Sequence, residues 1–263
     1  MSISPSAQDF VPHDEWPDVS VMLDGFGAPD LPASDALVGR TLPIDYDDHT
    51  TVTYRFDTVD SVSVSVDGGT PAAAAYRSVE ARPGIHLIDV LLGDGADTRN
   101  ITTVLNLADG RVTTAASGIA PVDGVMRTHT AFLSGRVQGA GAIDPRPRTD
   151  ALVGKRIYYR YSPTERYEHI YLTGGTFVWH CIDGGEKGLA DVDETRTFAL
   201  ADDIVIFFWK EGVMPVDSFL VVDLAEKRSI GRMFCWEAST SEPVHLPFDS
   251  RFTILNQTVY PED

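Results

Sequence analysis

Ser34-Asp35-Ala36-Leu37-Val38-Gly39-Arg40 is a stretch that the chain repeats further along as Thr149-Asp150-Ala151-Leu152-Val153-Gly154-Lys155. The register then continues without a gap, so that Tyr46 matches Tyr161 and Tyr54 matches His169. The repeats of solenoid proteins have periods of roughly 20–50 residues. The distance from Ser34 to Thr149 is much longer than that. The repetition therefore predicts a duplicated domain.

The repeat divides the chain into four segments. We expect an N-terminal arm over residues 1–33, a first domain over 34–143, a linker over 144–148 and a second domain over 149–263. The linker is rich in proline and follows a Gly-rich stretch, which is typical of a domain boundary. The arm is predicted to be irregular and to pack against a domain through its apolar residues, Phe10, Trp16, Val21, Met22, Leu23 and Phe26.

Short β-branched or alternating runs recur about every ten residues in both copies, separated by Gly, Asp and Asn. No long stretch places apolar residues at helical spacing. Eight such strands per copy favour an all-β fold, with each copy a closed antiparallel barrel that can hold one small ligand. A two-sheet sandwich is the main competing architecture.

The composition limits the classes of partner. The net charge is −18, with 39 acidic against 21 basic residues, and such a surface repels phosphate groups, so we expect no nucleic acid and no membrane as partner. The N-terminus lacks the pattern of a signal peptide, no apolar run is long enough to span a membrane, and the expected location is cytoplasmic. Cys181 and Cys235 are expected to be buried free thiols, although a cross-strand disulfide stays open.

The second copy carries a stripe of aromatic and ionisable side chains. Because strand side chains alternate between faces, several sets share a face, and inside one barrel they would line a pocket with apolar walls and few polar groups. These candidate ligand-contacting residues are Tyr159, Tyr161, Tyr167, His169, Tyr171, Trp179, Trp209 and Glu211.

The residue types in the stripe suggest acid–base chemistry. Paired phenols such as Tyr159 and Tyr161 can hold a carbonyl or carboxylate oxygen. A carboxyl group desolvated beside Trp209 has a raised pKa, which makes Glu211 a candidate general acid or base, and His169 could act in the same way. The competing interpretation is that the aromatic residues are barrel core and that Glu211 meets water at a strand end.

Lys187 lies in the Gly-rich loop Asp183–Gly188, which could close over the barrel mouth and bring this lysine to a substrate; a solvated turn charge is the competing interpretation. The histidines show no metal-ligand spacing and no Gly-rich phosphate loop is present, so we expect no metal and no cofactor. The first copy largely lacks this cavity chemistry at the matching positions, which favours a structural or dimerising role over a second active site, and a homodimer is a possible assembly.

The stretches Tyr161–Leu172, Trp179-His180-Cys181, Glu186–Asp191, Phe208-Trp209-Lys210-Glu211 and Val222-Asp223-Leu224 resemble the MoaF family. The first copy resembles the N-terminal half of the same family more loosely. This resemblance implies two tandem lipocalin-like (calycin) barrels, and the family's name implies a link to molybdenum cofactor biosynthesis.

Tyr159-Arg160-Tyr161, Tyr167-Glu168 and Trp209-Lys210-Glu211 are also similar to motifs of the phenolic acid decarboxylases, which are cofactor-free barrels acting on hydroxycinnamic acids. The similarity implies site roles for Tyr159, Tyr161, Tyr167 and Glu211. The arginine of that family's pattern has no match here, because its place falls near Gly188 and Lys187 is the nearest cation. A lysine does not replace the bidentate guanidinium clamp, so we expect weak decarboxylation or none.

We therefore expect a cofactor-independent lyase or isomerase that acts on a small aromatic or conjugated metabolite in the second barrel. Glu211 would be the general acid or base, and Tyr159, Tyr161 and Tyr167 would orient the substrate oxygen. The alternatives are a non-catalytic carrier or sensor of a small hydrophobic metabolite, and an accessory protein of molybdenum cofactor synthesis.

Overall fold

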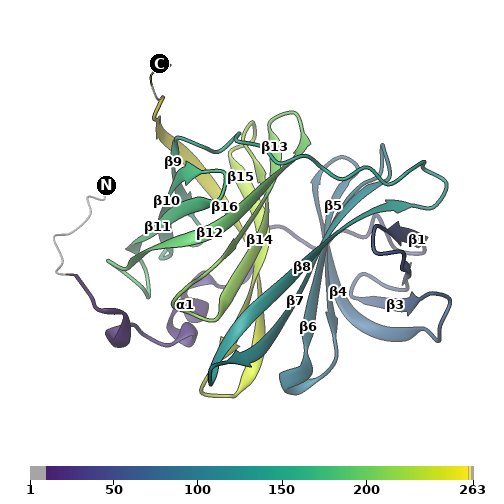
Figure 1. Cartoon of the computed structure of the whole chain (residues 1–263), viewed down its shortest axis with the longest axis horizontal. Helices are drawn as coiled ribbons and strands as arrows, with labels where there is room; N and C mark the ends of the chain where they lie inside the picture. The colour runs from purple at the N-terminus through teal and green to yellow at the C-terminus, as the bar shows by residue number, and fades with distance from the viewer. Residues whose placement is uncertain (1–9, 260, 262–263) are drawn as a thin grey trace. The chain divides into compact units, whose positions relative to one another are not determined.

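The structure is a computed structural model that describes residues 10–259 and residue 261, and it divides the chain into two compact units. One unit is residues 31–147; the other combines the chain from residue 148 onward with arm residues 10–30. Each unit contains one closed antiparallel barrel of eight strands (Figure 1). The predicted all-β fold with two tandem barrels is confirmed, and the sandwich alternative is wrong.

The first barrel follows chain order and closes where β1 pairs with β8, with Ile44 opposite Val137. A short 3₁₀ turn, η2 (Gly95–Asp97), joins β5 to β6. The strands are β1 (Thr41–Tyr46), β2 (Thr51–Phe56), β3 (Ser61–Val66), β4 (Ala72–Arg82), β5 (Ile85–Leu92), β6 (Arg99–Asn106), β7 (Arg111–Val122) and β8 (Val125–Val137).

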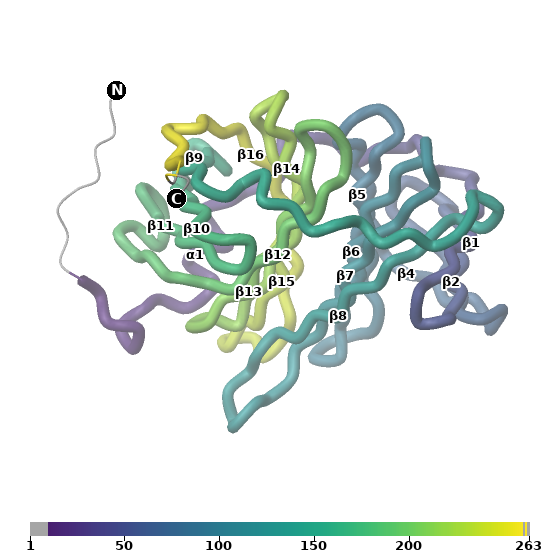
Figure 2. The backbone as a smooth tube through the Cα atoms, turned by 45° about the horizontal axis from the view of Figure 1, so that its top comes forward, coloured from purple at the N-terminus to yellow at the C-terminus, as the bar shows by residue number. Residues whose placement is uncertain are grey.

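The second barrel has the same order and closes where β16 pairs with β9, with Phe252 opposite Tyr159. Figure 2 traces its strands from green to yellow. They are β9 (Lys155–Arg160), β10 (Arg166–Thr173), β11 (Thr176–Asp183), β12 (Ala190–Ala201), β13 (Ile204–Lys210), β14 (Val216–Asp223), β15 (Arg228–Glu237) and β16 (Glu242–Gln257).

The repeated Asp-Ala-Leu-Val-Gly motif is the turn that leads into the first strand of each barrel. Leu37 and Leu152 are both fully buried. Gly39 and Gly154 have positive φ angles of 78° and 79°, which favour glycine. Each donates its N–H over 2.8 Å to a second-strand carbonyl, that of Phe56 or Tyr171. The motif recurs because both barrels need the same anchored turn.

Side-chain alternation places the aromatic stripe inside the second barrel, as predicted. The core includes Tyr167 and Tyr171 of β10 and Trp179 of β11. Glu168 and His180 have the opposite parity; they pair across β10 and β11, and Glu168 binds Arg156 of β9 over 2.6 Å. Cys181 and Cys235 are buried and free, so the predicted free thiols are confirmed.

The arm is not irregular throughout, and this prediction is wrong for residues 19–26. They form the helix α1 (Val19–Phe26), preceded by the 3₁₀ turn η1 (His13–Glu15). Val19, Met22 and Phe26 stand at helical spacing and enter the core of the second barrel, whereas Phe10 is exposed. Burial of this apolar face against the barrel stabilises a helix too short to form alone.

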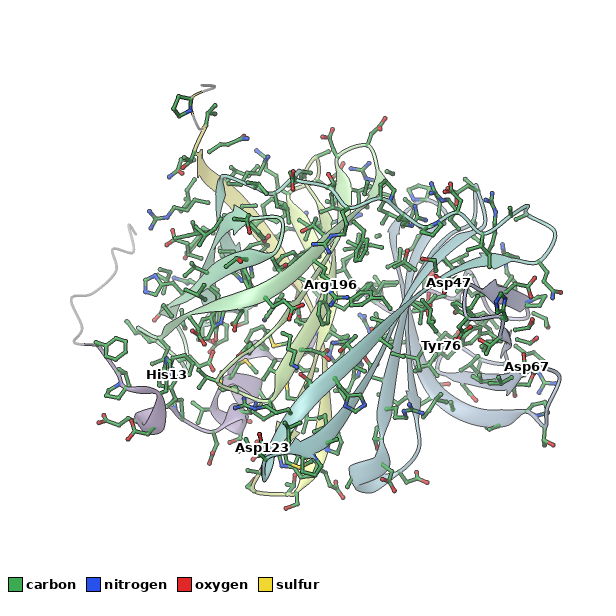
Figure 3. The ribbon with its side chains drawn as sticks, in the orientation of Figure 1. His13, Asp47, Asp67, Tyr76, Asp123 and Arg196 are labelled. Carbon is green, nitrogen blue, oxygen red and sulfur yellow. The ribbon has the colours of Figure 1, made fainter. Side chains whose placement is uncertain are left out.

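The segment before α1 continues the same contact. The His13 ring, labelled in Figure 3, lies 4.9 Å from the Trp16 ring, which in turn lies 5.7 Å from Trp179 of β11. The arm therefore belongs to the second barrel, as the grouping of residues 10–30 with that unit also shows. Residues 1–9 of the predicted arm lie outside the described residues.

None of the helices that the structure describes is long and apolar enough to cross a bilayer.

Candidate functional site

The second barrel encloses a cavity of about 10 Å³ between α1 and the inner faces of its strands. That is the space of about one water molecule. The lining combines aromatic and thioether side chains with two carboxyl groups: Met22, Phe26, Tyr161, Tyr167, His169, Trp179, Glu186, Trp209, Glu211 and Met233.

The structure brings six of the predicted site residues to this cavity and leaves three outside its lining. The six are Tyr161, Tyr167, His169, Trp179, Trp209 and Glu211. Tyr159 and Tyr171 are buried beside it, and their hydroxyl groups bond to each other over 2.8 Å. Lys187 does not line the cavity; its side chain is 46% exposed, with its Nζ atom 3.4 Å from the Asp183 carboxylate.

Glu211 follows β13 directly and is almost completely buried. Its Oε1 atom accepts a hydrogen bond of 3.2 Å from the Trp209 indole N–H, while its Oε2 atom has no hydrogen-bond partner. Burial raises the pKa of Glu211 well above its usual range, and the charges of Glu186 and Asp193 raise it further. Glu211 therefore holds its proton more tightly than an ordinary glutamate does.

Glu186 is the second carboxyl group of the cavity and comes from the β11–β12 loop. Its Oε2 atom accepts a 2.8 Å hydrogen bond from the Tyr167 hydroxyl, and its Oε1 atom has no partner. Burial raises the pKa of Glu186 to about 7; the hydrogen bond from Tyr167 lowers it, and the charge of Glu165 raises it. Glu186 thus exchanges its proton near neutral pH.

Two further buried carboxyl groups support this pair. Glu165 accepts hydrogen bonds from the Gly185 N–H over 3.0 Å and from the Tyr167 hydroxyl over 3.3 Å. Asp193 of β12 accepts a 2.9 Å bond from the Trp179 indole N–H, and burial raises its pKa to about 6. These contacts hold Tyr167 and Trp179 in fixed positions around the cavity.

The phenols differ in what their hydroxyl groups can do. Tyr167 donates to Glu186, and Tyr159 is engaged with Tyr171, whereas the Tyr161 hydroxyl is buried without a partner. Burial lowers the pKa of His169 to about 3, so this imidazole is neutral. Among the predicted phenols that line the cavity, Tyr161 alone has a hydroxyl group free for a ligand.

Helix α1 closes the cavity. The Phe26 ring packs 4.9 Å from Tyr161 and 5.9 Å from Tyr167, and the Ser162 hydroxyl donates to the Gly25 carbonyl over 2.8 Å. The helix lies so close to the β11–β12 loop that a Cβ atom on Gly185 would come within 2.5 Å of the Val21 carbonyl oxygen. The contact needs glycine at this position.

An open depression of about 510 Å³ lies on the outer side of this closure. It is lined by residues from the end of α1, the β9–β10 loop and β16, and Phe26 and Tyr161 line both it and the inner cavity. These two rings are therefore the partition between the depression and the buried carboxyl groups.

Sequence reasoning missed Glu186, Glu165, Asp193 and the two α1 residues Met22 and Phe26 as parts of the site. Glu186 is the direct neighbour of Lys187, and in a loop no face alternation tells which of the two turns inward. The residue types did contain a signal. A buried carboxyl group can lose its charge by protonation, and its burial therefore costs less free energy than the burial of an unpaired lysine.

The part of the chain that the structure describes shows no group of three or more His, Cys, Asp or Glu side chains that could hold a metal ion.

The first barrel has fewer aromatic and ionisable side chains in its interior than the second. The positions that match Phe177 and Trp179 are Val62 and Val64, and the Tyr46 hydroxyl is bonded to Thr114 over 3.0 Å.

Comparisons with known proteins follow the same division of the chain. Residues 14–121 match the MoaF N-terminal domain and residues 146–258 match the MoaF C-terminal domain. A solved structure, "Crystal Structure of a putative beta-lactamase from Burkholderia vietnamiensis", aligns over 43% of this chain and 100% of its own, with 18% identity and a TM-score of 0.35.

"Protein MoaF" of Klebsiella aerogenes is 36% identical to this chain over 202 residues, which cover 72% of this chain and 77% of that protein. Together with the two domain matches, this shows that the chain belongs to the MoaF family.

Proposed function

We propose that the second barrel is the site of a cofactor-independent lyase or isomerase that acts by acid–base chemistry on a small aromatic or conjugated metabolite. The observation that carries the proposal is the pair Glu186 and Glu211. Both carboxyl groups are buried in one aromatic-walled cavity, and each has an oxygen atom with no partner. A structural core seldom leaves such atoms unsatisfied.

The two carboxyl groups suit opposite roles. Glu186, with a pKa of about 7, is partly ionised at neutral pH and can accept a proton from the substrate. Glu211, with a pKa raised well above its usual range, holds its proton tightly and would be the group that donates one. Pairs of groups whose surroundings give them different proton affinities are the usual sign of an acid and a base in one site.

The tyrosines take separate roles in this proposal. Tyr161 is the one that contacts the substrate oxygen through its free hydroxyl group. Tyr159 stacks on Tyr161, with ring centroids 5.8 Å apart, and Tyr167 holds Glu186. Tyr159 and Tyr167 therefore position the groups that react, and His169 and Trp209 form the wall.

A substrate needs more room than the cavity offers. Because the enclosed space is that of about one water, Met22 and Phe26 must withdraw before a metabolite can enter. The depression beyond Phe26 and Tyr161 is the natural approach. Closure of α1 over the bound substrate would then exclude water from the reaction, as lids do in other enzymes.

The decisive test is Glu211→Gln, which keeps the shape of the side chain and removes the exchangeable proton. Incubation with p-coumaric acid, cinnamaldehyde, an aryl enone and an aryl amine, followed by absorbance and mass spectrometry, should identify a substrate. Turnover in Glu211→Gln should then fall about 100-fold or more while binding survives, because general acid–base catalysis contributes ~10²–10⁴-fold. Turnover that is unaffected by the substitution would contradict the proposal.

Glu226→Gln is the matched control, since Glu226 is exposed in the β14–β15 loop of the same barrel. It should leave turnover unchanged. No Arg or Lys is among the residues that line the cavity, which supports the expectation of weak or absent decarboxylation of p-coumaric acid.

A non-catalytic carrier or sensor is the second candidate, and the closure of the cavity by α1 favours it, because a buried pocket with a movable cover also suits storage of a ligand. A carrier would bind members of the panel without converting any of them. A role in molybdenum cofactor synthesis stays a prediction based on the family name.

A further inference from the structure

The lining of the inner cavity of the second barrel has carboxyl groups and no Arg or Lys side chain. It includes Glu186 and Glu211, with Glu165 and Asp193 bonded to the lining residues Tyr167 and Trp179. The imidazole of His169, which also lines the cavity, is held neutral by burial because its pKa falls to about 3. Lys187, the cation closest in sequence, is on the outside of the loop and next to Asp183.

Three polar atoms of this lining are buried without a hydrogen-bond partner: Glu186 Oε1, Glu211 Oε2 and the Tyr161 hydroxyl oxygen. Leaving such atoms unpaired is costly, so a ligand that satisfies them gains affinity. All three can accept hydrogen bonds. A ligand group rich in donors therefore suits the cavity best.

An ammonium group meets this requirement, because it has three N–H donors, no acceptor and a positive charge. Its hydrogen bonds to a carboxylate are charge-assisted and stronger than neutral ones. A carboxylate ligand would find no positive partner among the lining residues and would be repelled by Glu186. The charge content of the cavity thus separates amines from acids.

The walls of the cavity favour the same ligand. Tyr161, Tyr167, Trp179 and Trp209 line the same cavity as the two carboxyl groups. Aromatic faces attract cations, most strongly where water is excluded, and they also pack against an aromatic or conjugated body. Two of these four rings are indoles, and indole is the best cation–π partner among side chains.

We propose that this cavity binds a protonated primary amine on a small aromatic or conjugated body, with the ammonium group between Glu186 and Glu211 and against the Tyr161 oxygen. The inference rests on the proposed function for the location of the site, and it names the class of substrate or ligand. The aryl body would occupy the space that Met22 and Phe26 fill in the closed structure.

Binding should strengthen as pH rises from about 5.5 to 8, because the ammonium needs an ionised carboxylate and Glu186 has a pKa of about 7. The groups that act on Glu186 are Glu165 before β10 and Tyr167 of β10, and the charge of Glu186 in turn acts on Glu211 after β13. Asp193 and Asp191 of β12 act on Glu211. All of the carboxyl groups add negative charge as pH rises, so they act in the same direction.

The test compares three probes with a similar aryl-ethyl body: 2-phenylethylamine, 2-phenylethanol and 3-phenylpropionate. Each is titrated into the full-length protein in about 150 mM salt, which screens surface charge, and tryptophan fluorescence is followed. We expect the amine to bind at least ~10-fold more tightly than the alcohol, and the acid to bind more weakly than both.

The variant Glu186→Gln/Glu211→Gln should reduce the affinity of the amine to that of the alcohol and leave the alcohol within about twofold of its original affinity. Glu226→Gln/Glu242→Gln is the control. It removes two exposed carboxylates of the same barrel, so the net charge changes equally while the amine preference should persist. Thermal unfolding of both variants shows that they are folded.

Equal or tighter binding of the alcohol or the acid, or no binding of the amine up to about 10 mM, would overturn the inference. An amine preference without chemical conversion would leave this inference standing and remove the acid–base proposal. Conversion of an acid or an enone that depends on Glu211, without any amine preference, would do the opposite.

Discussion

Two neighbouring residues, Glu186 and Lys187, have opposite surroundings in the second barrel. Glu186 is 3% exposed in the cavity, and Lys187 reaches the solvent beside Asp183. Burial favours the neutral form of both groups, and the carboxyl group reaches that form near neutral pH at a smaller cost, because its ordinary pKa lies closer to 7 than that of an ammonium group. This end of the cavity is therefore lined by a carboxyl group and not by the lysine.

The stability of the second barrel should depend on pH through Glu186. The folded-state pKa of about 7 lies above the unfolded value near 4.5, so the folded state holds the proton more tightly and stability falls as pH rises from about 4.5 to 7. Replacing Glu186 with Gln removes this loss. Relative to the wild type, Glu186→Gln should gain on the order of 2–3 kcal/mol between pH 4.5 and 8.

Urea unfolding followed by tryptophan fluorescence measures this difference. All four tryptophans lie in the arm or the second barrel, namely Trp16, Trp179, Trp209 and Trp236, so the signal reports on that unit. Glu226→Gln should show no pH-dependent difference from the wild type. A stability difference for Glu186→Gln that stays constant across this range would show that the Glu186 carboxyl group is not perturbed.

At the scale of elements, α1 has the largest influence on the site. It buries Val19, Met22 and Phe26 in the barrel and leaves Val21 exposed. Its end is held by the Ser162–Gly25 hydrogen bond, and Gly27 follows with a φ angle of 67°. A short helix held by one apolar face and few hydrogen bonds is the kind of element that opens at low cost.

Phe26→Ala should open the cavity. Removing this ring from the partition should raise the association rate of 2-phenylethylamine several-fold in stopped-flow fluorescence, and should lower the unfolding free energy of the barrel by about 3 kcal/mol because a large buried side chain is lost. Val21→Ala, on the exposed face of the same helix, should change neither quantity appreciably.

Gly185→Ala tests the same element without removing a ring from the cavity. The added Cβ atom would meet the Val21 carbonyl oxygen at 2.5 Å, so the contact between α1 and the β11–β12 loop must widen. The association rate should increase as in Phe26→Ala. Unchanged association rates in both variants would show that α1 does not control access.

At the scale of the whole molecule, one fold was duplicated and the two interiors diverged. Tyr46 and Tyr161 occupy matching positions, and their backbone N–H groups make equivalent turns, to the carbonyls of Thr50 over 2.9 Å and of Glu165 over 3.0 Å. Their hydroxyl groups differ, because that of Tyr46 bonds to Thr114 and that of Tyr161 has no partner. The first barrel satisfies the hydroxyl group at this position internally, and the second barrel leaves it unpaired.

The pair Tyr46→Phe and Tyr161→Phe should therefore separate stability from binding. Tyr46→Phe loses a buried hydrogen bond and should destabilise the first barrel by about 1 kcal/mol in thermal unfolding followed by circular dichroism, with binding unchanged. Tyr161→Phe should leave stability the same or slightly higher and weaken binding of 2-phenylethylamine by about 3–10-fold. A binding loss in Tyr46→Phe instead would place a ligand in the first barrel.

The sequence by itself determined the duplication, the eight strands of each barrel and the inward face of the stripe. These features depend on local rules, namely the alternation of side chains along a strand and a turn that needs glycine at Gly39 and Gly154. The direction of a side chain can be predicted from the sequence wherever a regular strand sets it. The helical spacing of Val19, Met22 and Phe26 was also local, but too short to stand out in an arm rich in proline.

Only the tertiary structure decided how the site is completed. It placed α1 over the second barrel, turned Glu186 inward, and left the Tyr161 hydroxyl unpaired while joining Tyr159 to Tyr171. Each of these outcomes depends on contacts between residues far apart in the chain or within an irregular loop, where no periodic pattern sets the direction of a side chain. The charge of the cavity comes from those contacts.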